Sequence, residues 1–426
     1  MTNQPHHSLT ATLFTWVRAW AAELAATTAA IVLLAYIERT FGAGIQLLVL
    51  PAAALVFAAP PVREQARRLL GRRARMRRWR QALSGVVPPP ATPHLVEFRD
   101  DPAGSWAAVR TGPGGTVTEL ETRTEHLAAW LGAFDIRVER HPSHSGKAWL
   151  RALHRDPLDV APGPWPWLTA ARTSLHHPVP VGVDENGQPV RVGLVGHNLL
   201  VGGEPGSGKS VAISQIVAAA ALDPDCRLWL LDGKLVELAA WAAAADGTAG
   251  VDIFEANQLL ADIQAEMDGR YRQLLEQKLR KIGGDWGLHM VVVDELAHYS
   301  TWGDRKPRDR FNDLLRDLVS RGRAAGIIVV AATQKPGSDT VPTNLRDLFG
   351  YRWALRCTTP AASDTILGAG WAARDITAHS INPAQHGVGW LHHETSHPQR
   401  LRSHHLTDRD LTALARRAAT VRGRPT

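Results

Sequence analysis

Residues 203 to 210 read Gly203-Glu204-Pro205-Gly206-Ser207-Gly208-Lys209-Ser210 and fit the pattern G-x-x-x-x-G-K-[ST]. The largely apolar run 197–201 before them is short enough for a buried strand, and the run 211–222 after them suits a helix. A strand, a glycine turn and a helix in this order aim backbone N–H groups and a helix N-terminus at a polyphosphate. We therefore expect the phosphate loop, from Gly203 through Val211, to bind ATP.

Two residues of this loop and an acid pair further along suggest how the nucleotide is handled. Lys209 neutralises charge on the β and γ phosphates in such a loop, and the Ser210 hydroxyl reaches Mg²⁺. The run 290–293 is four apolar residues followed by Asp294 and Glu295, as expected for a buried strand that ends at the phosphate site. We predict that Asp294 holds the magnesium ion through its water shell and that Glu295 orients and deprotonates the attacking water. Such an acid pair is common by itself, but beside a phosphate loop it favours hydrolysis.

Downstream of the loop, apolar runs alternate with helical segments, which is typical of a parallel sheet covered on both faces. The expected strands are 228–231, 290–293, 327–332 and 353–356, and a long charged helix is expected over 258–281. Upstream of the loop, residues 179–194 are predicted to form a hairpin. The fold class is therefore α/β.

The N-terminal part contains two apolar spans, 16–36 and 44–59, each close to the roughly 17 to 25 residues that a membrane helix needs. The following block, 62–80, carries nine arginines. Because basic segments stay on the cytoplasmic side, we predict that residues 1–60 form a transmembrane helical hairpin in the cell membrane, with the domain that contains the phosphate loop in the cytoplasm. A buried helical pair in a soluble domain is the alternative, and Glu23 favours it. The arginines also suit contact with anionic lipid or nucleic acid.

Proline-rich stretches divide the remaining chain. Residues 61–92 are predicted to be a basic and proline-rich linker, because Pro88-Pro89-Pro90 breaks any helix. Residues 93–177 are predicted to form a small α/β domain without chemistry of its own. Its expected strands are 106–110, 116–120 and 136–139, with an amphipathic helix over 125–134. The ATPase domain with the phosphate loop is expected over 178–400, and residues 401–426 are predicted to be a helical tail.

Composition adds weaker indications. The net charge of +7 and the pI near 9.8 favour anionic partners, either nucleic acid or a phospholipid surface, although the excess of arginine and alanine also fits a GC-rich coding bias. Two cysteines, Cys226 and Cys357, give no sign of a disulfide scaffold. The seven histidines between His379 and His405 lack the spacing that would place metal ligands on one helix face.

Five blocks in order resemble the motor of the FtsK/SpoIIIE family of double-stranded DNA translocases, over about residues 178 to 395. They are Asn198 to Ser210, Leu231-Asp232-Gly233-Lys234, Val293-Asp294-Glu295-Leu296-Ala297, Arg321 through Pro336, and Asp364-Thr365-Ile366-Leu367-Gly368. The resemblance implies a RecA-like P-loop ATPase core that uses ATP and Mg²⁺ and forms a homo-hexamer around duplex DNA. Two departures from the family pattern are Gly233, where the family has proline, and His298, where it usually has an acid.

The resemblance also implies roles for two further residues. Gln334 matches the polar sensor of the γ-phosphate, at the end of a strand. A ring ATPase places a positive group in the neighbour's site to stabilise charge on the transferred phosphoryl group, and Arg323 is our candidate, with Arg321 and Arg352 close behind. DNA would be held through its phosphates, since a pump runs over any sequence.

The expected function is that of a membrane-anchored, ATP-driven double-stranded DNA translocase. The two spans and the short segment after residue 400 look most like the transfer proteins of actinomycete conjugative plasmids and integrative elements. We therefore expect plasmid or chromosomal DNA to be moved between cells or compartments. One alternative is a protein-secretion ATPase of the type VII kind, although such proteins usually contain several ATPase modules. The other is a membrane-tethered nucleotide switch, which Glu295 and Gln334 argue against.

Overall fold

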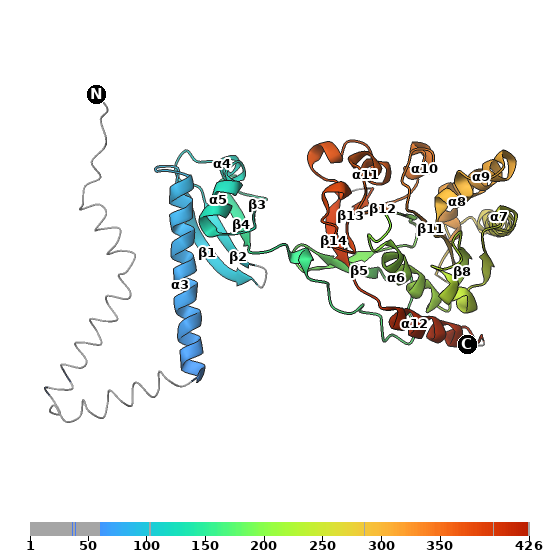
Figure 1. Ribbon diagram of the computed structural model, residues 1–426, viewed down its shortest axis with the longest axis horizontal. Helices are drawn as coiled ribbons and strands as arrows, with labels where there is room; N and C mark the ends of the chain where they lie inside the picture. The colour runs from blue at the N-terminus through green and yellow to red at the C-terminus, as the bar shows by residue number, and fades with distance from the viewer. Residues whose placement is uncertain are drawn as a thin grey trace. The chain divides into compact units, whose positions relative to one another are not determined.

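The computed structural model describes residues 36, 39, 60–101, 104–284, 286–394 and 396–424, and the chain divides into two compact units, Met1–Asp156 and Pro157–Thr426 (Figure 1). Almost all of the predicted membrane hairpin, residues 1–60, lies outside the described residues. Within the described part of the chain, no helix combines the length and the apolar character needed to cross a bilayer.

The first unit packs helices against a four-stranded antiparallel sheet with the order β1-β2-β4-β3. Its strands are β1 (His94–Asp101), β2 (Gly104–Arg110), β3 (Asp135–Arg140) and β4 (Lys147–Leu153), and its helices are α3 (Pro60–Val86), α4 (Val117–Glu121) and α5 (Thr124–Leu131). The sheet and helices share one buried cluster. A small unit of helices and strands thus precedes the unit that contains the phosphate loop.

Two predictions for this unit need correction. Most of 61–92, expected to be a linker, is the helix α3, because Trp79 and Leu83 lie one turn apart and are both buried in the core of the unit. The indole Nε1 of Trp79 donates to Ser105 Oγ at 2.9 Å. Residues 116–120, expected to be a strand, form α4, because the Thr116 side chain accepts a hydrogen bond from the backbone N–H of Glu119 and caps the helix.

The second unit is built on a ten-stranded mixed sheet with the order β6-β5-β14-β13-β12-β7-β11-β10-β8-β9. Its strands are β5 (Val179–Asp184), β6 (Pro189–Val192), β7 (Leu199–Gly202), β8 (Cys226–Leu231), β9 (Gly247–Ala249), β10 (Leu288–Val293), β11 (Ile327–Thr333), β12 (Tyr351–Leu355), β13 (Val388–His393) and β14 (Gln399–Ser403). The six strands from β12 to β9 are parallel, and five of them were predicted; β9 was not. The other four pair antiparallel, which the sequence analysis did not predict beyond the β5–β6 hairpin.

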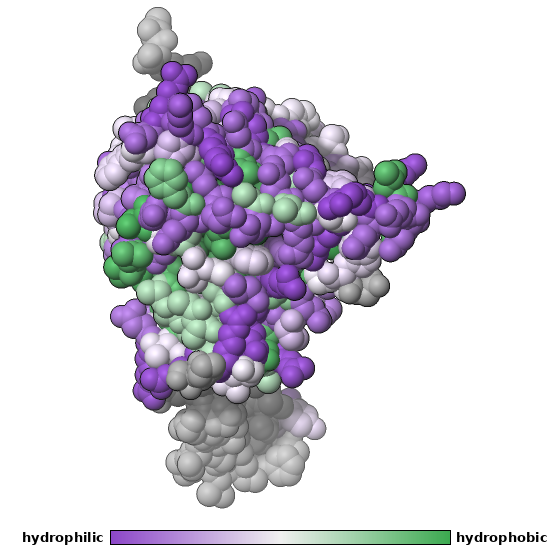
Figure 2. Space-filling view, turned by 90° about the vertical axis from the view of Figure 1, so that its right-hand side faces the viewer, coloured by the Kyte–Doolittle hydropathy of each residue, from purple (hydrophilic) through white to green (hydrophobic). Residues whose placement is uncertain are grey.

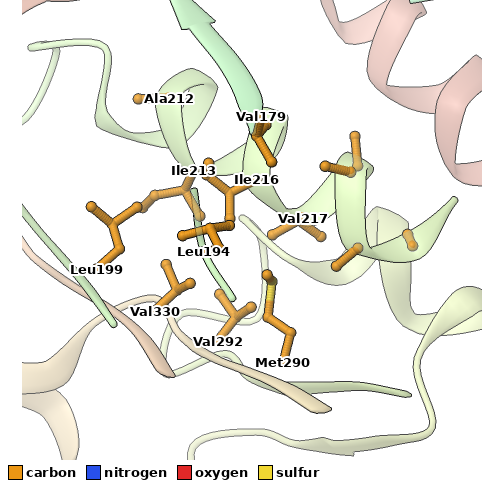
Figure 3. Packing of buried hydrophobic residues seen from close by; sticks show 14 of the residues in the cluster. Val179, Leu194, Leu199, Ala212, Ile213, Ile216, Val217, Met290, Val292 and Val330 are labelled. Carbon is orange, nitrogen blue, oxygen red and sulfur yellow. The ribbon is translucent and has the colours of Figure 1, made fainter. Parts of the chain in front are cut away.

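Helices cover both faces of this sheet. Successive strand residues point to opposite sides, and since the residues on both sides are apolar, both faces are buried. Met290 and Val292 of β10 face the helix α6 and its neighbour α12, whereas Val291 and Val293 face α7, α8, α9 and α11. Figure 3 shows Ile216 of α6 above strand residues that include Val292. The helices are α6 (Lys209–Ala221), α7 (Ile253–Glu276), α8 (Leu296–Ser300), α9 (Arg305–Arg321), α10 (Thr343–Arg346), α11 (Pro360–Leu367) and α12 (Asp408–Val421).

Both ends of the motor extend beyond their predicted limits. Trp165 is buried in the core of the second unit and donates to the carbonyl oxygen of Pro180 at 2.8 Å, so the segment from Pro157 belongs to the motor rather than to the small domain. At the other end, β14 crosses residue 400, and α12 packs against α6. The region predicted to be a tail is therefore an integral part of the second unit.

Candidate nucleotide-binding site

The phosphate loop connects β7 to α6 at the carboxyl edge of the parallel strands. Gly206 and Gly208 have φ values of +77° and +96°, a conformation that glycine adopts without strain. A Cβ atom at Gly208 would also lie 2.6 Å from the backbone nitrogen of Gly387. These two positions thus require glycine for backbone reasons, and the helix starts at Lys209 as the motif predicts.

Neighbouring segments hold the loop in place through its backbone. The Gly203 N–H donates to the carbonyl of Thr333 at 3.2 Å, and the Gly387 N–H donates to the carbonyl of Ser207 at 2.9 Å. His386 Nδ1 forms a hydrogen bond of 2.6 Å with the carbonyl oxygen of Gly206. The loop is therefore fastened both to the end of β11 and to the turn before β13.

A hollow of about 480 Å³ opens beside this loop, a size suited to a small-molecule ligand. It is lined by Ala161, Glu204, Gly206, Gly208, Lys209, Ser210, Val211, Gln334, His386, Gly387, Arg402, Ser403, His404 and His405. Thus most of the predicted loop and Gln334 meet at one place. The residues around β13 and β14 that line the hollow were not predicted, since their local sequence pattern does not indicate that they lie near the phosphate loop.

Lys209 and Asp294 form a buried ion pair beside the hollow. Lys209 Nζ lies 3.0 Å from Asp294 Oδ1, with 3% and 1% of the two side chains exposed. Burial raises the pKa of the Asp294 carboxyl, and the adjacent Lys209 ammonium opposes this by favouring the charged form. The strand β10 therefore delivers Asp294 to the phosphate loop as predicted.

The donor set at this place fits Mg²⁺. Asp294 Oδ2 is buried and has no hydrogen-bond partner among the described residues. The Ser210 hydroxyl lines the adjoining hollow. Carboxylate and hydroxyl oxygens are ligands that this hard cation accepts, usually together with water and phosphate.

Glu295 is buried and is held on both carboxylate oxygens. The Thr333 hydroxyl donates to Oε1 at 2.8 Å, and the Gln334 N–H lies 3.2 Å from the same atom. Lys234 Nζ is 3.1 Å from Oε2, an ion pair whose geometry is not that of a hydrogen bond. Lys234 lies in one of the blocks that resemble the family, but its contact with Glu295 does not follow from the sequence.

Arg323 lies away from these groups. It is in a 3₁₀ turn, Gly322–Ala325, that precedes the amino end of β11, whereas Gln334 follows the carboxyl end of the same strand. Its side chain is 59% exposed and its Nη1 is 3.8 Å from Glu394 Oε1. The structure thus brings together all the predicted site residues around the phosphate loop except Arg323, whose action on a neighbouring subunit stays a prediction.

The two other arginines considered for that role have partners within the chain. Arg321 pairs with Asp268 and Asp317. Arg352 is mostly buried beside His392, and burial lowers its pKa. Arg323 is the most exposed of the three.

Comparisons with known proteins agree with this architecture. A family model described as "FtsK/SpoIIIE family" matches residues 169–289. The DNA translocase FtsK of Staphylococcus epidermidis is 25% identical over 304 residues, which cover 66% of this chain and 37% of the relative. Protein Tra of Streptomyces lividans is 28% identical over 319 residues, which cover 68% of this chain and 48% of the relative. The chain therefore spans between about a third and a half of the length of these relatives.

One solved structure has a comparable fold over most of the chain. The pCW3 conjugation coupling protein TcpA, in its monomer form with ATPγS, gives a TM-score of 0.53 at 20% identity and covers 80% of this chain and 98% of its own. At this identity the likeness concerns the fold alone. It agrees with the mixed α/β architecture and with the large, largely parallel sheet.

Proposed function

Because the chain carries a domain of the FtsK/SpoIIIE family, we propose that it is an ATP hydrolase that translocates double-stranded DNA. The observation that carries this proposal is the meeting of the phosphate loop, the Lys209–Asp294 pair and Glu295 beside a hollow of nucleotide size. The similarity to the DNA translocase FtsK of Staphylococcus epidermidis supports the choice of DNA as the substrate.

The site residues divide the chemical work between them. The loop amides and Lys209 bind the β and γ phosphates, and Ser210 and Asp294 would hold Mg²⁺, which supplies further neutralisation of phosphate charge. Glu295 accepts the proton of the attacking water, and the Gln334 side chain at the edge of the hollow senses the γ-phosphate. Glu295 must first exchange its contacts with Thr333 and Lys234 for a contact with water, since both of its oxygens are occupied.

The finer features of the proposal concern the assembly and its place in the cell. We propose a homo-hexamer in which Arg323 acts on the neighbouring subunit, anchored in the cell membrane by residues 1–60 with the motor in the cytoplasm. The exposed Arg323 side chain supports the first part, and the two apolar spans support the second. The likeness in fold to TcpA, which is described as a conjugation coupling protein, favours conjugative DNA transfer as the role.

The surface offers apolar area for contact between subunits. Figure 2 shows one side of the molecule, mainly hydrophilic with apolar residues scattered over it. Among the large apolar side chains of the second unit that are more than half exposed are Leu235, Val236, Phe254, Leu275 and Trp302. Leu235 and Val236 follow β8 in the segment that contains Lys234, so a subunit docked there would lie close to the nucleotide site.

The deciding test is the ATPase rate of the purified protein with and without long linear duplex DNA. We expect DNA to raise the rate, and we expect Glu295→Gln to bind ATP and stay assembled but to turn over at least 100-fold more slowly. Glu276→Gln, at an exposed glutamate that ends α7, is the matched control and should behave as the parent protein. Turnover that ignores DNA but responds to a secretion-signal peptide would point to protein export instead. Binding without turnover at any DNA concentration would indicate a nucleotide switch.

A further inference from the structure

Two histidines and a glutamate meet at the edge of the sheet opposite the phosphate loop. His197 precedes the amino end of β7. His393 is the last residue of β13, which runs antiparallel to β12, and Glu394 follows it. One ligand atom from each of the three lies within 4.8 Å of the other two. His197 Nε2 is 3.8 Å from Glu394 Oε1, and the two imidazole rings are 5.2 Å apart between centroids.

Backbone hydrogen bonds hold the segments around this cluster in place. The Glu394 N–H donates to the carbonyl of Gly350 at 3.0 Å, and the Tyr351 N–H donates to the carbonyl of Asn198 at 3.0 Å. Gly350 leaves room for His197, since a Cβ atom there would lie 3.0 Å from His197 Cδ2. The two segments that supply the ligands are thus fixed side by side through β12.

From this arrangement we propose that His197, His393 and Glu394 form a binding site for a transition-metal ion such as Zn²⁺. Two imidazoles and a carboxylate are a ligand set that zinc uses in sites with an open fourth position. Ligand atoms of a tetrahedral zinc site lie roughly 3.3 Å apart, because each metal bond is about 2.0 to 2.1 Å long. Side-chain rotations that move the ligand atoms by about an ångström would therefore close the site around the ion.

Glu394 has the freedom that this closure needs. Its carboxylate is 3.8 Å from both His197 Nε2 and Arg323 Nη1, beyond hydrogen-bond distance, and 44% of its side chain is exposed. The adjacent His392 is not part of the site, because strand alternation points it to the other face, where it meets Arg352 and Trp371.

The ion would have a consequence for Arg323, and this part rests on the proposed function. Glu394 is the acidic partner that the structure shows closest to Arg323. A metal ion that takes the carboxylate removes this partner and adds positive charge beside the guanidinium. Metal binding would therefore bias Arg323 away from its own chain and toward a neighbouring subunit.

The test measures metal binding to the full chain in detergent, without nucleotide or DNA. After treatment with EDTA and its removal, the protein is titrated with Zn²⁺ against a chromophoric chelator and with Co²⁺, whose visible absorption reports tetrahedral coordination. We expect one ion bound through this site, with the affinity reduced at least tenfold in His197→Ala and in Glu394→Gln. The control is the double variant His141→Ala, His144→Ala, which removes a stacked histidine pair of the first unit and should bind as the parent does.

Each outcome decides the matter. Unchanged affinity and an unchanged Co²⁺ spectrum in both site variants would overturn the proposal, and so would loss of the ion only in the control. Glu394→Gln replaces an exposed side chain by one of nearly the same shape, so it removes a ligand without disturbing the fold. ATP binding by the same sample checks that the variant is folded. Because the readout is metal affinity, the site stands or falls independently of whether the chain moves DNA.

Discussion

At the scale of single residues, the candidate nucleotide-binding site contains charged side chains that are buried away from solvent. A buried ion pair contributes little net stability, because desolvation of both ions offsets their attraction, but removing one partner leaves a charge unpaired at a cost of about 3 to 5 kcal/mol. Lys209 and Asp294 are such a pair. The proposed binding of nucleotide and Mg²⁺ by these two residues gives a functional reason for the pair, since its burial gives little net stability.

We predict that Lys209→Met abolishes nucleotide binding and also lowers the free energy of unfolding by about 3 kcal/mol or more. Adding Asp294→Asn should recover most of the stability and none of the binding, as measured by urea denaturation and by titration with a fluorescent ATP analogue. If the single variant unfolds like the parent protein, the pair is not buried as described.

The same variant should show a dependence on pH. Burial raises the pKa of Asp294 and Lys209 opposes this, so the pKa should rise further in Lys209→Met. A carboxyl group with a raised pKa in the folded state holds its proton more tightly there than in the unfolded state, so the stability deficit should shrink as pH falls toward about 4. Urea denaturation at a series of pH values measures this, and a deficit independent of pH would contradict it.

Lys234 is predicted to restrain the general base. Its ammonium lies 3.1 Å from Glu295 Oε2, where the attacking water would otherwise have access to that oxygen. We expect Lys234→Met to raise the ATPase rate without DNA several-fold and to reduce the ratio of the rates with and without DNA. Lys278→Met, at an exposed lysine after α7, is the control. A fall in both rates would instead mean that Lys234 takes part in catalysis.

At the scale of elements, the turn before β13 acts as a support for the phosphate loop. His386 binds the Gly206 carbonyl, and removing this bond should cost about 0.5 to 1.5 kcal/mol. His386→Ala should therefore weaken ATP binding roughly two- to tenfold, measured by calorimetry, whereas His379→Ala, at an exposed position, should leave it unchanged. Equal effects in the two variants would show that the turn plays no part.

Arg422, at the C-cap of the helix α12, has the largest set of partners among the residues that fasten this helix to the rest of the second unit. Arg422 donates to the carbonyl oxygens of Ala220, Ala221, Asp223 and Cys226, and it pairs with Asp246. Arg422→Ala leaves several of these acceptors without their partner, so we expect a loss of about 2 kcal/mol or more in the free energy of unfolding. Arg416→Ala, exposed on the same helix, should change it by less than about 0.5 kcal/mol. A larger effect at Arg416 would contradict this account of the helix.

At the scale of the whole molecule, all described residues that line the hollow lie in the unit Pro157–Thr426. A chain that begins at Pro157 should therefore fold and bind ATP with the affinity of the full chain. Calorimetry on both proteins tests this. A chain that instead begins at Val179 should unfold, because it lacks the buried Trp165 and Leu175. Equal stability of the two fragments would show that residues 157–178 are dispensable.

Several features of this protein follow from its sequence alone, because they rest on neighbours in the chain. The glycines at 206 and 208, the helix start at Lys209 and the acid pair after an apolar run are local patterns, and the backbone permits few alternatives to them. The prediction failed for α3, because its many arginines suggested a linker although one face of the helix is buried in the core. It also failed for α4, where the alternating pattern suggested a strand but the capping Thr116 side chain favours a helix.

Only the tertiary structure determined which distant segments complete the site. His386 and Gly387 meet the phosphate loop about 180 residues away in the chain, Lys234 meets Glu295, and His197 meets Glu394. Each of these contacts depends on the order in which strands pair within the sheet. Strand order is set by the total free energy of burying both faces, and a single segment carries no local signal of it.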